Sequence, residues 1–275
     1  MNPHAVKSVS PVRLVQSLLD NHRLIFDLSK REVVGRYRGS AMGLLWSFFN
    51  PALMLVVYTF VFSVVFKARW AGGSGSKMEF ALVLFAGLML FNLFAECVNR
   101  APHLILGNVS YVKKVIFPLE ILAFVNLGSA LFHFFISLVV WLIFYAAFFG
   151  TPPLSLIQLP LIVLPVMLLT LGCTWLFASL GVYLRDVSQV IVVLTTILLF
   201  MSPVFYPLSA LSAKFRLLMR LNPLTFPVEQ ARATMIWGTG LDWTGWFFYI
   251  AFASFVAWLG FAWFQKTRKG FADVI

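Results

Sequence analysis

The sequence predicts an all-α membrane protein with six transmembrane helices, on three observations. Hydrophobic residues make up 61% of the chain and charged residues only 11%, and the mean hydropathy is +0.91. Soluble proteins carry about 25% charged residues, so a surface this poor in charge is suited to lipid. Six stretches are apolar over roughly the 20 residues that a spanning helix needs. None of them alternates like a barrel strand, which leaves helices as the spanning elements.

The six apolar stretches follow one another along most of the chain. The third is longer than one crossing needs, so we expect it to tilt or to begin as a surface helix before Pro118. The fourth contains Pro160 and Pro165, which predict kinks, and the fifth ends in a proline-rich segment. The predicted spans are residues 41–66, 80–98, 116–149, 154–183, 187–206 and 243–264.

Residues 1–35, before the first span, are predicted to form an amphipathic helix. Charged residues alternate with four apolar residues that recur near helical spacing: Leu14, Leu18, Ile25 and Leu28. Such a helix lies in the plane of the lipid headgroups. It serves either as a plain anchor or as a platform against which a partner docks. Residues 36–275 are predicted to form a single six-span domain.

Two connections between spans are longer than simple turns. Residues 99–115 are long enough to form a short helix that lies across the cytoplasmic membrane face. Residues 207–240 predict two short outer helices that break at Asn222 and Pro223, because proline lacks a backbone donor and disfavours helix at the preceding residue. This outer segment is too apolar for a free loop and too polar for a span. We therefore expect it to be re-entrant, dipping into the outer leaflet.

The charge distribution predicts the orientation of the chain. Fourteen of the 21 Lys and Arg residues fall on the side that carries both chain ends, and seven fall on the other side. The richer side is cytoplasmic by the positive-inside rule. We therefore expect a multi-pass membrane protein with both termini in the cytoplasm. The net charge of +11 indicates membrane lipid headgroups or a cytoplasmic subunit as partners, and no basic soluble module indicates nucleic acid.

Three polar side chains within or beside apolar stretches are candidates for specific contacts. Glu96 lies near the cytoplasmic end of its span, where we expect an ion pair with Arg100 or a neighbour. His133 is either a packed, hydrogen-bonded residue or part of a proton relay. Arg232 lies three residues after Glu229, a spacing that permits an ion pair, and its alternative role is an anchor at the headgroups.

Several classes of chemistry have no motif in this sequence. The glycine-rich run at residues 72–77 has the wrong spacing for a phosphate-binding loop and lies on the predicted outer side. No acidic pair supports a membrane-embedded glycosyl- or acyltransferase, and few ionisable groups lie near the membrane midplane, where a secondary transporter needs them. We predict no catalytic residue, metal or cofactor in this chain, and energy supplied by another subunit. Cys97 and Cys173 are predicted to be core residues.

Four motifs, in order along the chain, resemble those of type-2 ABC exporter permeases for polysaccharides, which include O-antigen, capsule and teichoic acid exporters. The resemblance covers nearly the whole chain. The first motif is Arg36-Tyr37-Arg38-Gly39-Ser40-Ala41-Met42-Gly43-Leu44-Leu45-Trp46 followed by Pro51, the family's entry motif. The others are Ser110 to Pro118, Leu184-Arg185-Asp186-Val187, and Asn222-Pro223-Leu224 with Arg232, which look like its two cytoplasmic loops and its outer loop.

The resemblance implies a transport permease, not itself an enzyme, that works as a homodimer with two cytoplasmic ABC ATPase subunits. ATP and magnesium would be bound by those subunits. The substrate would be an undecaprenyl-linked polysaccharide, with O-antigen as the first choice and capsule, teichoic acid or a small hydrophobic compound as alternatives. The N-terminal amphipathic helix would be an interface helix.

The resemblance also implies roles for particular residues. A coupling helix in the first cytoplasmic loop would contact the ATPase through Asn108, Ser110, Tyr111, Lys113 and Lys114. The outer helices would gate the exit at Asn222, Pro223 and Arg232. The first and fifth spans of both copies would line the channel, where aromatic rings can support the apolar faces of sugars. The candidates, which otherwise pack in the core or face lipid, are Trp46, Phe49, Tyr58, Phe200, Phe205 and Tyr206.

Overall fold

The computed structural model describes residues 10–61, 70, 76–113 and 117–275, and within these residues the regular structure is helical. Four helices carry a segment long and apolar enough to cross a membrane: α4 (Lys77–Arg100), α6 (Ile121–Phe149), α7 (Leu159–Tyr183) and α11 (Trp243–Thr267). The α4 segment continues to His103 over 27 residues, about 40 Å of helix. That length exceeds the roughly 30 Å hydrocarbon core of a bilayer.

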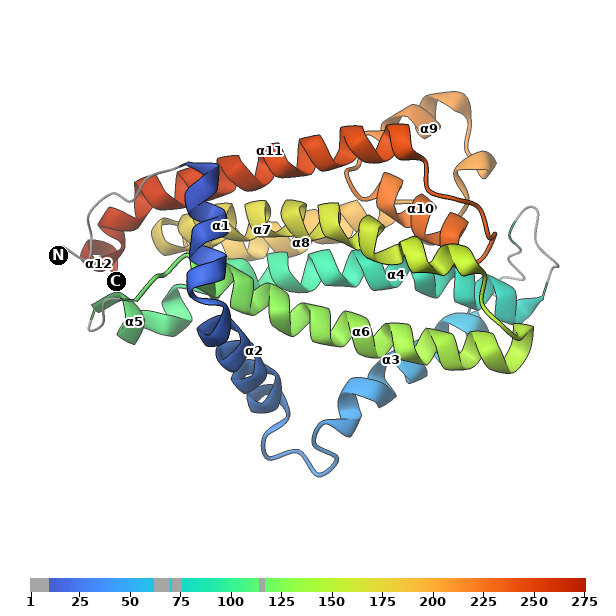
Figure 1. Cartoon of the computed structure of the whole chain (residues 1–275), viewed down its shortest axis with the longest axis horizontal. Helices are drawn as coiled ribbons and strands as arrows, with labels where there is room; N and C mark the ends of the chain where they lie inside the picture. The colour runs from blue at the N-terminus through green and yellow to red at the C-terminus, as the bar shows by residue number, and fades with distance from the viewer. Residues whose placement is uncertain (1–9, 62–69, 71–75, 114–116) are drawn as a thin grey trace.

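Helix α4 lies at the centre of the bundle. Nearly all of its side chains between Phe80 and Val98 are buried, and α6, α7 and α10 (Thr225–Met235) pack around it (Figure 1). A helix that is apolar around most of its circumference is stable inside a bundle or in lipid. Composition alone therefore does not select α4 for the centre, because α6 is as apolar and its spanning segment is 17% buried, against 89% for that of α4.

The first and fifth predicted spans form shorter helices. Helix α3 (Leu45–Tyr58) and helix α8 (Val187–Phe200) have 14 residues each, about 21 Å of α-helix. Turns follow α8 at residues 201–206, and residues 62–66 of the first predicted span lie outside the described residues. The described residues therefore contain four helices of spanning length and two shorter apolar ones, and six complete crossings stay a prediction.

Helices α7 and α11 cross at close range through glycine. A Cβ atom added at Gly172 would lie 2.5 Å from the backbone oxygen of Val256, and one added at Gly260 would overlap the carbonyl of Gly172. Pro160 lies in the first turn of α7, where its missing N–H costs no helical hydrogen bond, and only Pro165 lies inside the helix.

The N-terminal segment forms two helices. Helix α1 (Pro11–Asp20) and helix α2 (His22–Tyr37) are separated at Asn21, whose side-chain amide donates to the carbonyl of Ser17 at 2.8 Å. The single amphipathic helix expected from the sequence is therefore divided, because Asn21 satisfies a carbonyl that the helix leaves open at its end. Helix α2 packs along α6, with the Ser29 hydroxyl donating to the carbonyl of Val125 at 3.3 Å.

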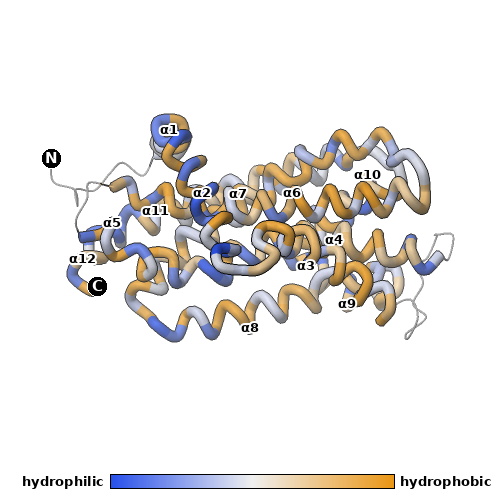
Figure 2. Tube along the Cα trace, turned by 90° about the horizontal axis from the view of Figure 1, so that it is seen from below, coloured by the Kyte–Doolittle hydropathy of each residue, from blue (hydrophilic) through white to orange (hydrophobic). Residues whose placement is uncertain are grey.

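The remaining short helices lie at two opposite ends of the bundle (Figure 1). One end carries the first connection and the C-terminal residues, and the other carries the outer segment. Figure 2 shows polar residues gathered along α1 and α2 and toward the first of these ends. The helices at that end are η2 (Ala101–His103), η3 (Leu106–Asn108), α5 (Val109–Lys113), η6 (Arg268–Gly270) and α12 (Phe271–Val274). Those at the other end are η4 (Leu154–Gln158), η5 (Leu208–Ala210), α9 (Ala213–Arg220) and α10.

Candidate functional site

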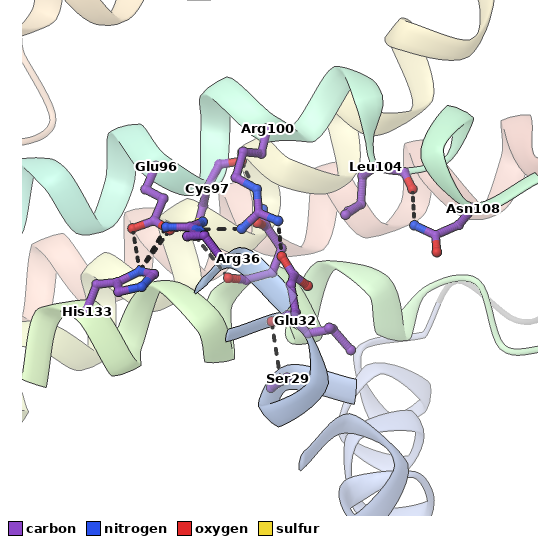
Figure 3. A network of polar contacts seen from close by, with 11 residues as sticks. Ser29, Glu32, Arg36, Glu96, Cys97, Arg100, Leu104, Asn108 and His133 are labelled. Atoms are coloured by element: carbon purple, nitrogen blue, oxygen red, sulfur yellow. Dashed lines mark hydrogen bonds and ion pairs between the residues drawn. The ribbon is translucent and has the colours of Figure 1, made fainter. Parts of the chain in front are cut away.

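A network of charged side chains joins α2 to α4 and α6. Glu96 of α4 accepts from Arg36 of α2 at 2.6 Å and from the Nδ1 nitrogen of His133 of α6 at 3.0 Å (Figure 3). Arg100, one turn after Glu96, lies 3.9 Å from it and also pairs with Glu32 of α2. Two carboxylates and two guanidinium groups therefore balance one another where the N-terminal helix meets the bundle.

The two nitrogens of His133 have different partners. Nδ1 lies 3.0 Å from Glu96, and Nε2 lies 3.1 Å from the hydroxyl of Tyr37. A neutral imidazole that donates from Nδ1 to the carboxylate can accept the tyrosine proton at Nε2, which satisfies both ring nitrogens. The expectation that His133 is a hydrogen-bonded residue within the bundle is confirmed.

Some residues of the entry motif join this network, and others lie on the surface. The ion pair expected at Glu96 is present, but Arg36 is its nearer partner, which the spacing of Glu96 and Arg100 alone could not indicate. Tyr37 joins the network through His133, whereas Arg38 and Trp46 are exposed. Gly43 has a φ of 52°, and this left-handed conformation accounts for glycine in the turn before α3. The role of the motif in substrate entry stays a prediction.

The segment expected to couple to a partner lies across the polar end of the bundle. Asn108 donates to the carbonyl of Leu104 at 2.9 Å, which closes the turn before α5 (Figure 3). Tyr111 accepts from Arg31 of α2 at 2.9 Å and stacks on Phe117 with ring centroids 4.3 Å apart. Beside this contact, residues of α2 and of this segment line a cavity of about 420 Å³.

The coupling candidates differ in exposure. Ser110 and Lys113 are exposed on α5, whereas Asn108 and Tyr111 are half-buried and hold the segment in place. Lys114 lies outside the described residues. Two side chains of α5 are therefore open to a partner surface, and their contact with an ATPase stays a prediction.

A buried ion pair fixes the C-terminal residues behind α5. Arg268 donates to Glu120 at 2.9 Å, and both side chains are less than 5% exposed. The indole of Trp175 donates to the Glu120 carbonyl at 3.0 Å, which adds α7 to the contact. Helix α12 packs on both α5 and α7. Helix α5 therefore packs against C-terminal residues that a buried ion pair holds in place, an arrangement that no sequence motif indicated.

The channel candidates form two groups. Trp46, Phe49 and Tyr58 lie on α3, and the first two are 42% and 40% exposed. Phe200 ends α8 and is 60% exposed, with its ring 5.7 Å from that of Phe205. Tyr206 donates to the carbonyl of Phe200 at 2.5 Å. Aromatic surface is thus available on both short helices, and its contact with a glycan stays a prediction.

The outer segment breaks where the sequence predicts. Helix α9 ends at Arg220 and α10 begins at Thr225, with Asn222 and Pro223 between them. The side-chain amide of Asn222 donates to the Leu198 carbonyl of α8 at 2.9 Å, and its oxygen accepts from the backbone of Leu224 at 2.9 Å. Asn222 therefore fastens the break between the two helices to the end of α8.

Arg232 lies inside the protein and not at the headgroups. Its side chain is 2% exposed and donates to the backbone carbonyls of Val83, Pro203 and Val204. It also pairs with Glu229 at 3.2 Å, as the spacing predicted, and lies over the ring of Trp70 at 4.4 Å. Burial lowers the pKa of Arg232 to about 10, so the guanidinium stays charged at neutral pH and holds α10 against α4.

Four apolar helices of spanning length, with a charge network where α2 meets α4 and α6, define a multi-span membrane protein. Residues 23–236 match the family described as ABC-2 type transporter. That match covers most of the sequence, and the chain belongs to this family.

Named relatives agree with this assignment. The chain is 31% identical to the O-antigen export system permease protein RfbA of Myxococcus xanthus, over 78% of this chain and 80% of the relative. It is 24% identical to a protein of the same description from Klebsiella pneumoniae, over 92% and 95% of the two chains. It is 22% identical to the polysialic acid transport protein KpsM of Escherichia coli, over 76% and 79%.

Proposed function

We propose that this chain is the transmembrane subunit of an ATP-driven ABC transporter that exports a lipid-linked polysaccharide, most specifically O-antigen, across a bacterial inner membrane. The observation that carries this proposal is the similarity to O-antigen export permeases, which extends over 92% of the chain in one relative. The first motif of the sequence lies in the matched region, as do α5 and the outer segment.

The energy comes from two cytoplasmic ATPase subunits that contact α5. Ser110 and Lys113 are exposed there, and α5 is supported from behind by α12. A contact that transmits force must rest on a support that does not yield, because a yielding segment dissipates the motion. The buried pair of Glu120 and Arg268 supplies this rigidity.

The functional unit is a homodimer of this chain. Both short helices present large apolar side chains on their outer faces, including Leu53 and Val56 of α3 and Val190 and Val193 of α8. Two copies that pair through α3 and α8 would enclose a channel between them, with Trp46, Phe49 and Phe200 as its aromatic residues.

A complementation experiment tests the function. Deletion of the gene is expected to abolish polysaccharide at the cell surface while its lipid-linked precursor accumulates inside, and the intact chain is expected to restore export. Unchanged surface polysaccharide and no accumulated precursor in the deletion strain would refute the proposal.

A charge-reversal experiment tests the ATPase contact. Changing Lys113 and Lys114 both to Glu is expected to abolish export and substrate-dependent ATP hydrolysis, because charge complementarity guides docking of the partner. The matched control reverses Lys266 and Lys269, two exposed lysines near the end of the bundle that carries α5. If both double variants lose export equally, the effect belongs to the charge of this end and not to α5.

Capsule export is the second candidate, favoured by the similarity to the polysialic acid transport protein. The two substrates differ in their fate outside the inner membrane. An O-antigen is found joined to lipopolysaccharide core, whereas a capsule is not, so analysis of the exported glycan separates them.

A further inference from the structure

The C-terminal half of α4 carries a polar stripe in a helix that is otherwise mostly buried. From Phe80 to Val98, Asn92 and Glu96 are the two residues of α4 that are not buried. They lie four residues apart, on one face of the helix. Asn99 continues the same face one turn later. A polar face in a buried helix needs polar surroundings, because an unsatisfied amide in an apolar environment is costly.

This stripe opens into a cavity of about 370 Å³ between α2, α3, α4 and α6. The neighbouring helices add polar side chains at helical spacing, Ser47 and Asn50 from α3 and His133 and Ser137 from α6. The cavity thus collects polar groups from three apolar helices. Four separate positions that converge on one space indicate a site and not isolated exceptions to the apolar pattern.

The charges within the cavity cancel. Arg36 is paired with Glu96 at 2.6 Å, and Glu96 also accepts from His133. The amides of Asn50 and Asn92 remain accessible, and neither has a hydrogen-bond partner among the described residues. The free binding capacity is therefore that of neutral amides, which donate and accept at once. Such groups match neutral hydroxyls better than they match an ion.

The apolar part of the lining completes the description of a ligand. The rings of Tyr58, Phe85 and Phe134 line the same cavity. A pyranose ring presents hydroxyls at its edge and C–H groups on its face, so it can bond to amides while it packs against an aromatic ring. The volume lies at the low end of the roughly 300–1,000 Å³ found for ligand pockets, which fits one sugar ring and not an oligosaccharide.

We propose that this cavity binds a single neutral sugar unit of the transported glycan within one copy of the chain, with Asn50 and Asn92 as the hydrogen-bonding residues. The proposal rests on the proposed function as a polysaccharide exporter, and it names where the glycan first contacts the chain. The site lies beside the charge network that fixes α2, so the same helices that hold the network would sense whether a sugar is present.

Photocrosslinking in cells tests the site. The photoreactive residue p-benzoylphenylalanine replaces Asn92 or Asn50 in the only copy of the permease, in cells that make their own lipid-linked glycan. The control position is Phe135, which is 61% exposed on α6 and lines a separate apolar groove. Illumination is expected to give a glycan-bearing adduct at positions 92 and 50 and not at 135. The adduct is expected to vanish when assembly of the glycan is blocked.

The contrary outcomes are distinct. If the substituted chains export normally and yield only lipid adducts, only cross-linked dimers or none, the cavity holds lipid, a second copy or water, and the sugar site is wrong. Equal glycan adducts at position 135 would overturn it as well. Export that does not depend on the chain at all would instead refute the proposed function.

Substitution without a bulky probe gives a second measurement. Asn92→Leu is expected to lower the export rate at least about tenfold at an unchanged membrane level, since it removes the amide and retains similar size. Asn92→Gln, which keeps the amide, is expected to retain most of the rate. Full export by Asn92→Leu combined with Asn50→Leu would exclude a role of these amides.

Discussion

Arg232 illustrates how one side chain can hold several segments together. Its buried guanidinium bonds to α4, to the turn after α8 and to the partly exposed Glu229 of its own helix. Five donors in a planar fork can serve several carbonyls at once, which the single ammonium of lysine cannot. Gly87 leaves the space, because a Cβ there would lie 2.9 Å from the guanidinium. If this end acts as a gate, we therefore expect α10 to stay in place while other segments move.

Replacing Arg232 is expected to destabilise the outer end. Arg232→Met leaves Glu229 and three carbonyls without this donor, and a buried carbonyl left unsatisfied costs about 1–3 kcal/mol. Arg232→Lys recovers only part of that, because a lysine reaches fewer of the carbonyls. Thermal unfolding of the purified protein in detergent measures both, and Arg220→Lys on the exposed face of α9 is the control. A melting temperature unaffected by Arg232→Met would contradict the conclusion that Arg232 holds α10 against α4.

Glu96 is expected to control how firmly α2 is held. Glu96→Gln removes the negative charge shared by Arg36 and His133, so the network keeps an excess positive charge. Amide hydrogen exchange in residues 22–37 is expected to rise by tenfold or more. Asp27→Asn removes the same charge from an exposed position of α2 and is expected to leave exchange unchanged. If both variants raise hydrogen exchange equally, the stability of α2 depends on the overall charge of this region and not on the contacts of Glu96.

At the scale of elements, the sequence predicted where the apolar stretches lie but not where the helices end. Hydropathy located all six apolar stretches, because burial in lipid requires that composition. It could not indicate that α8 ends at Phe200, because the end of that helix depends on the turns and neighbouring segments that follow it. The break of the N-terminal segment at Asn21 was equally hidden, since a single asparagine is compatible with a continuous helix.

The crossing of α7 and α11 predicts a sharp sensitivity to a single methyl group. Gly260→Ala places a Cβ on the carbonyl of Gly172, and the two helices must separate. Overpacking of this kind costs about 1–3 kcal/mol. Gly35→Ala is the matched control, because a Cβ there meets nothing within 4 Å and alanine favours the helix. Scanning thermal unfolding is expected to show opposite signs for the two variants.

At the scale of the whole molecule, the sequence indicated the ends of the bundle and not what connects them. Charge counts and motif order placed the coupling and outer segments on opposite sides, and the structure has them at opposite ends (Figure 1). The ion pairs that fix each end were mostly not foreseen. Glu120 and Arg268 are 148 residues apart in the chain, and Arg36 of α2 pairs with Glu96 of α4. Because these partners are distant in the sequence, no short motif or spacing indicates that they pair.

The predicted orientation can be tested by reporter fusions. A fusion after Lys77, at the start of α4, is expected to report the outer compartment, and a fusion after Ile275 the cytoplasm. A fusion after Gly150 is expected to agree with Lys77, because α6 ends there on the far side of the bundle. Agreement of the Lys77 and Ile275 reporters on one compartment would rule out the proposed orientation of the chain.

The pair of Glu120 and Arg268 has a consequence for biogenesis. At about 5–20 residues per second, the ribosome delivers Arg268 roughly 7–30 s after Glu120. During that interval α6 enters the translocon and the bilayer with a carboxylate at its start that still lacks its guanidinium. A chain stopped by a nonsense codon before residue 268 lacks Arg268 and also α12, which packs on α5 and α7. The last eight residues, 268–275, therefore complete the packing of helices that were synthesised long before them.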